Sequence, residues 1–181
     1  MKVTRAAVTG SLALTLSGCL SAERQDYAIP NPFCQVRGVS GAVVKPLLLA
    51  GESLYVDLRG LTSEPGQDQV CVVQVDKEDG LQITTLRNEA NIDTLHYAKE
   101  GARPLADAKP ASIPGVTSVA IGDDGALLSA DCPSTGGDYL VTTVRVGDRE
   151  KPPENPAEQR RNLEAFLRGY IPGLIQAKCT K

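Results

Sequence analysis

The chain has 181 residues, of which 19 are basic and 22 are acidic, and its formal net charge is −3. This mild acidity argues against a nucleic-acid partner and against electrostatic attachment to anionic lipids. The length suits one domain with a sizeable core.

The first nineteen residues have the order of a secretory signal. Lys2 and Arg5 precede an uncharged apolar stretch over residues 6–16, and small residues follow directly before Cys19. Residues 6–18, about 13 residues, would span only about 20 Å as a helix, which is too short for a bilayer core of roughly 30 Å. The ending Leu-Ser-Gly-Cys at residues 16–19 therefore predicts a lipoprotein signal in which Cys19 becomes acylated.

The signal predicts both the address of the protein and its domain organisation. We expect a signal peptide at 1–18, a lipidated N-terminus and flexible tether at 19–32, and a single α+β domain at 33–181. Removing the signal takes away two basic residues and no acidic one, so the remaining 163 residues carry a net charge of −5. Lipid on Cys19 would hold them on the outer face of the cytoplasmic membrane, on the extracellular side.

The four other cysteines predict disulfide bonds. Cys34, Cys71, Cys132 and Cys179 lack the short CxxC spacing of zinc sites and redox motifs. Two structural disulfides in an oxidising compartment are therefore expected. Four cysteines allow three connectivities, and the spacing does not decide among them, although we favour one disulfide in each half of the domain, Cys34 with Cys71 and Cys132 with Cys179.

The first half of the domain predicts a short helix followed by strands. Ser40 is a suitable N-cap for a helix over 41–49, in which Pro46 allows one turn and then a bend. Alternating and β-branched residues predict three strands, with a turn at 76–80 between the second and the third. These strands are expected at residues 53–58, 70–75 and 81–86.

The second half repeats this order. A short helix is expected over 91–99 with Asn91 as its cap, before strands at 117–121, 126–130 and 139–146. In the last strand the residues from Leu140 to Val146 at even positions are the more apolar set and should face the core. The whole pattern predicts an antiparallel sheet of five to six strands built from hairpins.

A C-terminal amphipathic helix gives the clearest periodic signal. Asn155 is the expected N-cap, Pro156 the first helical residue and Glu158 the third. Pro172 predicts a kink or restart, because proline removes a hydrogen bond from a helix interior. The apolar stripe that should cover the sheet consists of Leu163, Phe166, Leu167, Tyr170, Ile171, Leu174 and Ile175.

No catalytic, metal-binding or cofactor-binding constellation is apparent. His96 is the only histidine and is expected on a helix surface, and serine-hydrolase and phosphate-loop motifs are missing from the sequence. The acidic pairs at 78–79 and 123–124 are interpreted as turn residues rather than ligands. Glu52, Asp57 and Arg59 are interpreted as charges on a solvated edge, where alternating charge would also discourage edge-to-edge pairing. An enzyme that uses carboxylates alone remains a remote alternative.

Several segments carry a resemblance that covers most of the chain after the signal. They are Leu16–Cys19, Asp26–Pro30, Phe33–Cys34, Lys45–Glu52, Val70–Val73, Ala130–Cys132, Arg160–Tyr170 and Cys179. Together they resemble small lipoproteins of unknown function from Streptomyces and related actinobacteria. The resemblance implies an exported α+β domain, loosely similar to the DUF3558 lipoproteins and to the Mog1/PsbP-like fold, with helices flanking a sheet.

These observations favour a lipid-anchored protein that is not an enzyme and needs no cofactor. We expect it to bind a protein or a component of the cell envelope. The alternative is a carrier that holds a small hydrophobic ligand between the sheet and the C-terminal helix, with its mouth at residues 169–173.

Overall fold

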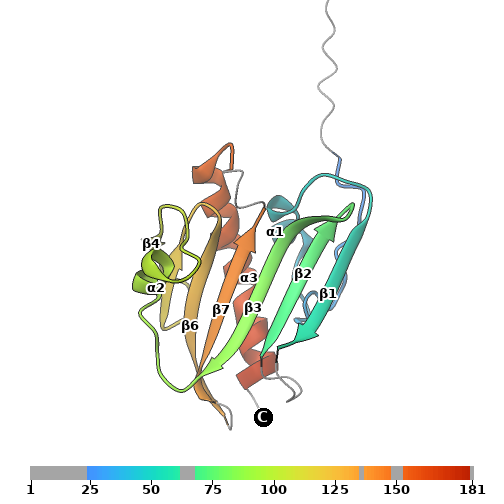
Figure 1. The fold of residues 1–181 in the computed structure, drawn as a ribbon. Coiled ribbons are helices and arrows are strands. Elements are labelled where there is room, and N and C mark those ends of the chain that lie inside the picture. The colour runs from blue at the N-terminus through green and yellow to red at the C-terminus, as the bar shows by residue number, and fades with distance from the viewer. Residues whose placement is uncertain (1–23, 62–67, 135–136, 148–152, 180–181) are drawn as a thin grey trace, which may run out of the picture.

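A seven-stranded antiparallel sheet forms the centre of the computed structural model, which describes residues 24–61, 68–134, 137–147 and 153–179 (Figure 1). The order β1-β2-β3-β7-β6-β5-β4 joins two meanders where β3 pairs with β7. The α+β class is confirmed, with seven strands instead of five to six. They are β1 (Leu54–Gly60), β2 (Gln69–Val75), β3 (Glu78–Asn88), β4 (Lys109–Pro110), β5 (Ser118–Ile121), β6 (Gly125–Ser134) and β7 (Gly137–Val146).

The strand that the sequence analysis missed is β4. It contains only Lys109 and Pro110, which pair with Ile121 and Ala120 of β5. Two residues cannot show a period of two, and proline is depleted in strands because it lacks the N–H donor. The sequence therefore contains no signal for this edge strand.

The turn between β2 and β3 is tighter than predicted. Asp76 and Lys77 both have positive φ, 50° and 74°, as a two-residue hairpin turn requires. The expected turn at 76–80 is wrong, since Glu78 and Asp79 already pair with β2. A register shift between Val73 and Gln74 accommodates the difference.

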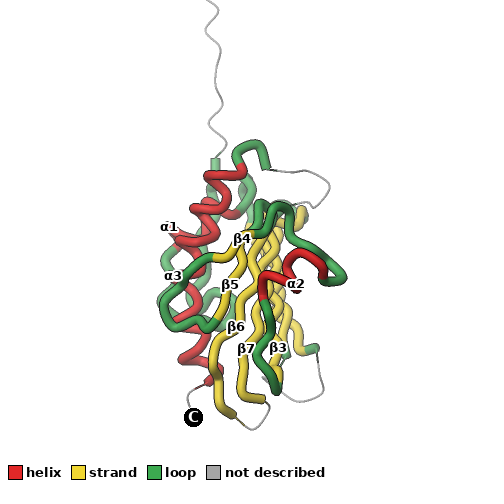
Figure 2. Tube along the Cα trace, turned by 90° about the vertical axis from the view of Figure 1, so that its left-hand side faces the viewer, coloured by secondary structure: helices red, strands yellow, loops and turns green. Residues whose placement is uncertain are grey.

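The helices lie on both faces of the sheet (Figure 2). The first, α1 (Gly41–Val44), continues into a 3-10 turn, η1 (Lys45–Leu47), and both lie on the same face as α3 (Pro156–Cys179). The Ser40 hydroxyl accepts the N–H of Ala42 at 3.2 Å, which confirms its predicted role as N-cap. The change to 3-10 geometry at Pro46 matches the expected bend.

The other face carries α2 (Thr94–Glu100). It begins later than the predicted 91–99, and its cap is Asp93 rather than Asn91. The Asp93 carboxylate accepts the N–H of His96 at 3.0 Å. Both residues are good caps, so the sequence alone could not choose the one that fits the loop.

The C-terminal helix begins as predicted. The Asn155 side chain accepts the N–H of Glu158 at 3.2 Å and donates to its carboxylate at 3.0 Å. The helix does not restart at Pro172 but continues to Cys179. Ile171 and Leu174 are buried on either side of the proline, and their packing holds this part of the helix on the sheet.

A tight turn from Phe33 to Val36 inserts the N-terminal segment into the core. The two residues exchange backbone hydrogen bonds of 2.9 Å. The Phe33 ring lies edge-on to the rings of Phe166 and Tyr170, with centroids 6.4 Å away in each case. We call residues 33–36 the N-terminal hook.

The residues before the hook are not a tether. The Gln25 amide donates to the carbonyls of Lys45 and Leu48 at 2.9 Å, and the Tyr27 hydroxyl donates to the carbonyl of Leu49 at 2.6 Å. The predicted tether is therefore wrong for residues 24–32, and its remainder, 19–23, lies outside the described residues. Polar side chains that suggested a solvated linker instead bind backbone carbonyls.

Two glycines let the hook and α1 approach α3 closely. A Cβ atom on Gly173 would lie 2.5 Å from Cγ1 of Val36, and one on Gly169 would lie 3.2 Å from Cγ2 of Val43. Cβ atoms in proteins essentially never come as close as 2.5 Å to another side-chain carbon, so the packing of Val36 requires glycine at position 173. These glycines flank Pro172 in the sequence, but they serve the contact rather than a kink.

We predict that Gly173→Ala lowers the free energy of unfolding by about 1 to 3 kcal/mol, because the new methyl group would overpack a stiff, buried valine. Gly169→Ala is the matched control, since its looser contact is offset by the gain of about 0.5 to 1 kcal/mol for alanine in a helix. Urea unfolding measures both. Equal stability of Gly173→Ala and the unmodified chain would contradict the close contact described between α3 and Val36 of the hook.

Candidate functional site

The cysteines form the two disulfides that the sequence favoured. Cys34 of the hook is bonded to Cys71 of β2, and Cys132 of β6 is bonded to Cys179 at the end of α3. Each bond ties a helix-side segment to the sheet. The expected lipidation site, Cys19, lies outside the described residues.

The residues with catalytic potential are dispersed. His96 is exposed on α2, with its Nδ1 3.7 Å from the carboxylate of Glu100. Within the described ranges, no group of three or more histidine, cysteine, aspartate or glutamate residues could hold a metal ion.

The acidic pair at 123–124 stabilises the fold. Asp123 accepts from the Arg160 side chain of α3 at 2.6 Å, and Asp124 accepts from Arg145 of β7 at 3.0 Å. The hydrogen bond to Asp123 raises the pKa of the Arg160 guanidinium above its usual value. The prediction that this pair lies in a turn is confirmed, since it connects β5 to β6, whereas the pair at 78–79 belongs to β3.

A groove of about 830 Å³ lies beside these turns. Its acidic side includes the engaged residues Asp123 and Asp124, and Asp79 accepts from Gln74 at 2.8 Å. Its apolar side comes from Leu47 and its neighbours after α1. The groove is thus the boundary between the hairpin turns, η1 and the start of α3, and most of its acids already have partners.

The space between the sheet and α3 is filled where a ligand mouth was expected. Tyr170 and Ile171 are buried, and the cavity beside Tyr170 and Leu174 measures about 10 Å³. That is room for a single water molecule at most. Burial raises the pKa of the Tyr170 phenol, whose hydroxyl donates to the carbonyl of Cys34 at 3.4 Å. A carrier would have to open this packing to bind its ligand.

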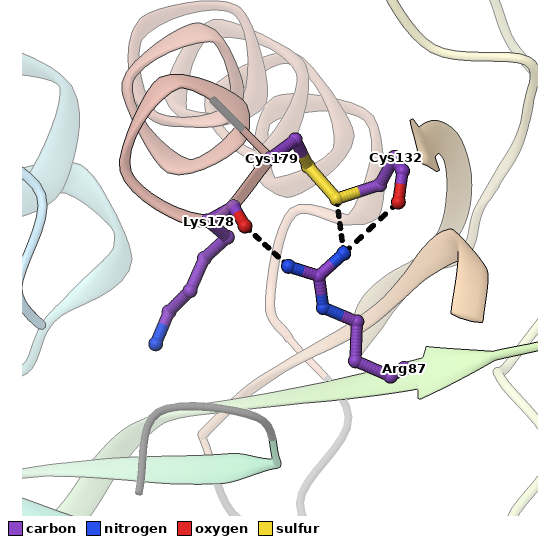
Figure 3. The surroundings of a disulfide bond; sticks show 4 residues. All are labelled: Arg87, Cys132, Lys178 and Cys179. Atoms are coloured by element: carbon purple, nitrogen blue, oxygen red, sulfur yellow. Dashed lines mark hydrogen bonds between the residues drawn. A yellow bond between two sulfur atoms is a disulfide. The ribbon is translucent and has the colours of Figure 1, made fainter. Parts of the chain in front are cut away.

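Arg87 connects the far end of the sheet to the end of α3 (Figure 3). Its guanidinium donates to the carbonyl of Cys132 at 3.0 Å, to the sulfur of the same residue and to the carbonyl of Lys178. The last carbonyls of a helix lack internal partners and carry partial negative charge. Arg87 therefore caps α3 from outside the helix, beside the Cys132–Cys179 disulfide.

Two cationic side chains, Arg87 and Lys178, lie near each other at the end of α3. Desolvation lowers the pKa of Arg87, and the charge of Asp68 opposes the shift. Desolvation and the charge of Arg87 both lower the pKa of Lys178, whose ammonium donates to the Gln69 amide oxygen at 2.6 Å. This cluster could not be found from the sequence, because Arg87 and Lys178 are far apart in the chain and share no motif.

The face of the sheet that points away from α3 is divided into two halves. Over β5 and β6 it is covered by α2 and the following loop, which bury a small cluster around Leu105 and Ala120. Figure 1 shows no described element in front of β1, β2 and β3. We call this uncovered half the open face.

The strand register identifies the side chains of the open face. Tyr55 is 60% exposed and Leu86 is 38% exposed, and Leu61, directly after β1, is 50% exposed. Three of the five exposed large hydrophobic residues among those described thus lie on this face. The register adds Asp57 and Arg59 from β1, Val70, Val72 and Gln74 from β2, and Gln82 and Thr84 from β3.

The charges of the open face are already engaged. Asp57 and Arg59, two residues apart on β1, form an ion pair, and Asp79, the register partner of Gln74, accepts from its amide at 2.8 Å. The remaining members are apolar, hydroxyl or amide side chains, which suit contact with another macromolecule better than attraction of a small ion. The alternation in residues 53–58 showed which side chains of this strand share a face, but the sequence did not reveal which half of the sheet α2 would leave uncovered.

The chain was also compared with known proteins and with the requirements of a membrane span. No protein-family model, curated protein or solved structure matches it. Among the described residues, no helix is both long and apolar enough to cross a bilayer. The open face is therefore the candidate site on its geometry alone.

We predict that Arg87→Met lowers the free energy of unfolding by about 2 kcal/mol, because the hydrogen bonds from a charged donor to the Lys178 carbonyl of α3 and the Cys132 carbonyl of β6 are lost. Arg161→Met, at an exposed position of α3, should change it by less than about 0.5 kcal/mol. Urea denaturation of the two variants provides the measurement. Equal effects would show that Arg87 does not cap the helix.

Proposed function

We propose that this protein is a lipid-anchored extracytoplasmic lipoprotein that binds a protein or cell-envelope partner through the open face and performs no catalysis. The observation that carries the proposal is the uncovered face of β1, β2 and β3 (Figure 1), on which Tyr55, Leu61 and Leu86 are exposed. Large apolar side chains gathered on one exposed face and bordered by polar residues are typical of interaction surfaces. Its centre is made of strand residues, which are rigid and lose little conformational entropy on binding.

The anchor part of the proposal rests on the signal pattern and on the disulfides. Two disulfides are typical of a protein that folds in an oxidising compartment. The acylated residue would be Cys19, and Arg24 is already held at Gly51 by a hydrogen bond of 2.8 Å. Five residues span at most about 18 Å, so the domain would stay close to the bilayer.

We predict that Cys19→Ala moves the protein from the membrane fraction to the soluble fraction and removes the mass of the acyl chains. Stable anchoring needs more than one acyl chain, which an acylated N-terminal cysteine supplies. Fractionation followed by intact mass measurement tests both effects. Retention of the variant in the membrane would contradict lipid anchoring through this residue without affecting the argument for the open face.

The binding part is tested by crosslinking in the producing cell. A photoreactive amino acid at Leu86 should give a discrete adduct, whereas the same group at Tyr97 should not. Tyr97 is the matched control, because it is 53% exposed but lies on α2. Val72→Asp, which places a charge on the central β2 strand of the open face, should reduce the adduct at least about tenfold.

The opposite pattern would refute the proposed surface. An adduct of equal yield at Tyr97, or an adduct at Leu86 that Val72→Asp leaves unchanged, would show that the partner does not recognise the open face. Native mass spectrometry of the same preparation reports any small ligand and thus tests the carrier alternative separately.

A further inference from the structure

The outer edge of β1 presents backbone groups that bind no other described segment. Just outside the strand, the Asp76 N–H donates to the Ser53 carbonyl at 3.0 Å and the Leu61 N–H donates to the Asp68 carbonyl at 2.8 Å. Hydrogen-bonded and non-hydrogen-bonded pairs alternate along an antiparallel ladder. The odd-numbered residues 55, 57 and 59 therefore bond to β2, and the even-numbered residues Leu54, Val56, Leu58 and Gly60 point their N–H and C=O groups outward.

The two edges of the sheet are protected very differently. At the opposite edge, β4 has two residues, and one of them is a proline without a donor. β1 has seven residues, contains no proline or lysine and keeps a regular register with β2 throughout. Short strands, proline, bulges and charged side chains, above all lysine, are the usual protection of an edge. Of these β1 has only the charges of Asp57 and Arg59, which are opposite in sign, so it is an edge that can accept a strand with complementary charges.

The start of β1 is fixed in place for such a contact. The Asp76 carboxylate accepts the N–H groups of Glu52 and Ser53 at 3.0 and 2.9 Å and the Ser53 hydroxyl at 2.7 Å. These bonds, led by the one from the hydroxyl, lower the pKa of Asp76. The carboxylate thus holds the chain where it enters the strand.

The residues of β1 on the open face form a sequence that is complementary to itself. In chain order they are aromatic, acidic, basic and aliphatic, at Tyr55, Asp57, Arg59 and Leu61. An antiparallel copy presents the same four in reverse order. Acid then faces base and the aromatic residue faces the aliphatic one, twice each.

We propose that two copies of this chain associate through their β1 strands, antiparallel, with Leu58 opposite Leu58 of the second copy. This register places Asp57 opposite the second copy's Arg59 and Tyr55 opposite its Leu61. Both contacts are non-hydrogen-bonded pairs, in which side chains lie close together, with Cβ atoms about 4.5 to 5.5 Å apart. The contact extends the sheet continuously across both copies.

The backbone and the charges agree on this register. The pairs formed by residues 56, 58 and 60 with 60, 58 and 56 of the second copy exchange about six backbone hydrogen bonds. A shift by two residues in one direction puts Asp57 opposite Asp57, and a shift in the other direction puts Arg59 opposite Arg59. Like charges in directly opposite positions are destabilising, so only one register satisfies all four side chains.

The association is compatible with the proposed function but does not depend on it. The two-fold axis is perpendicular to the sheet, so the N-terminal ends of both copies lie at equal heights along that axis and can reach one bilayer. The open faces of the two copies become one continuous surface. Tyr55 and Leu61 are covered from the side, while Val72, Thr84 and Leu86 stay available.

The test is sedimentation of the domain released by Cys19→Ala, measured over a range of concentrations. The unmodified edge should dimerise. Asp57→Arg and Arg59→Asp should each raise the dissociation constant at least about tenfold, because each places like charges opposite each other twice. Arg161→Asp, a charge reversal on exposed α3, should leave the constant unchanged.

Two restorations distinguish edge pairing from general effects of charge. The double variant D57R/R59D recreates the complementary pattern and should restore dimerisation. An equimolar mixture of Asp57→Arg and Arg59→Asp should form mixed dimers, because two arginines then face two aspartates. A monomer at all concentrations, single variants that dimerise normally, or failure of both restorations would overturn the proposal. Crosslinking from Leu86 reports on the open face independently of all these outcomes.

Discussion

The insertion of the N-terminal hook between the sheet and α3 is the contact on which the rest of the structure depends. Phe33 fills the space next to two aromatic rings of the helix, and these rings stack on each other with centroids 5.0 Å apart. The neighbouring Cys34 is bonded to β2. Val36 in turn occupies the space that Gly173 leaves free on α3. Sheet, helix and N-terminal segment are therefore joined at one place by aromatic packing, by a disulfide and by the close contact that the absence of a side chain at Gly173 permits.

This arrangement leaves half of one face of the sheet uncovered. The hook, α1 and α3 concentrate the core on one side, and the small helix α2 covers only the β5 and β6 half of the other side. The β1, β2 and β3 half has no such cover among the described elements (Figure 1), and Tyr55, Leu61 and Leu86 stay exposed on it among polar and β-branched side chains. In the proposed function, stability and recognition are thus assigned to opposite faces of the same strands.

Local patterns predicted the elements better than their contacts. The caps Ser40 and Asn155 and the core side of β7 could be identified because each depends on neighbouring residues or on a period of two. The two-residue strand β4 has no period to detect. The sequence analysis did not predict that Gln25 and Tyr27 are held against the domain, because their hydrogen-bond partners are backbone carbonyls about 20 residues away.

The candidate site shows the same limit. Asp57 and Arg59 were visible in the sequence as charges on an edge, but their meaning depends on facts that only the fold supplies. The fold puts β1 at the edge of the sheet. The alternation of its hydrogen bonds to β2 leaves the backbone N–H and C=O groups of its even-numbered residues pointing outward. Arg87 was not singled out at all, since this charged residue directly after the predicted strand at 81–86 proves to be the cap of a helix that begins about 70 residues later.

The Cys34–Cys71 bond also determines how the domain would respond to tension. A pull on the N-terminal end can peel off residues 24–33, which extend to at most about 35 Å. The load then passes through the disulfide directly into β2, which is held by hydrogen bonds to β1 on one side and to β3 on the other. A partner that grips the open face would hold these same three strands. Force between a membrane anchor and that partner would bypass α3 and the whole β4–β7 meander, so these parts would stay mechanically unloaded.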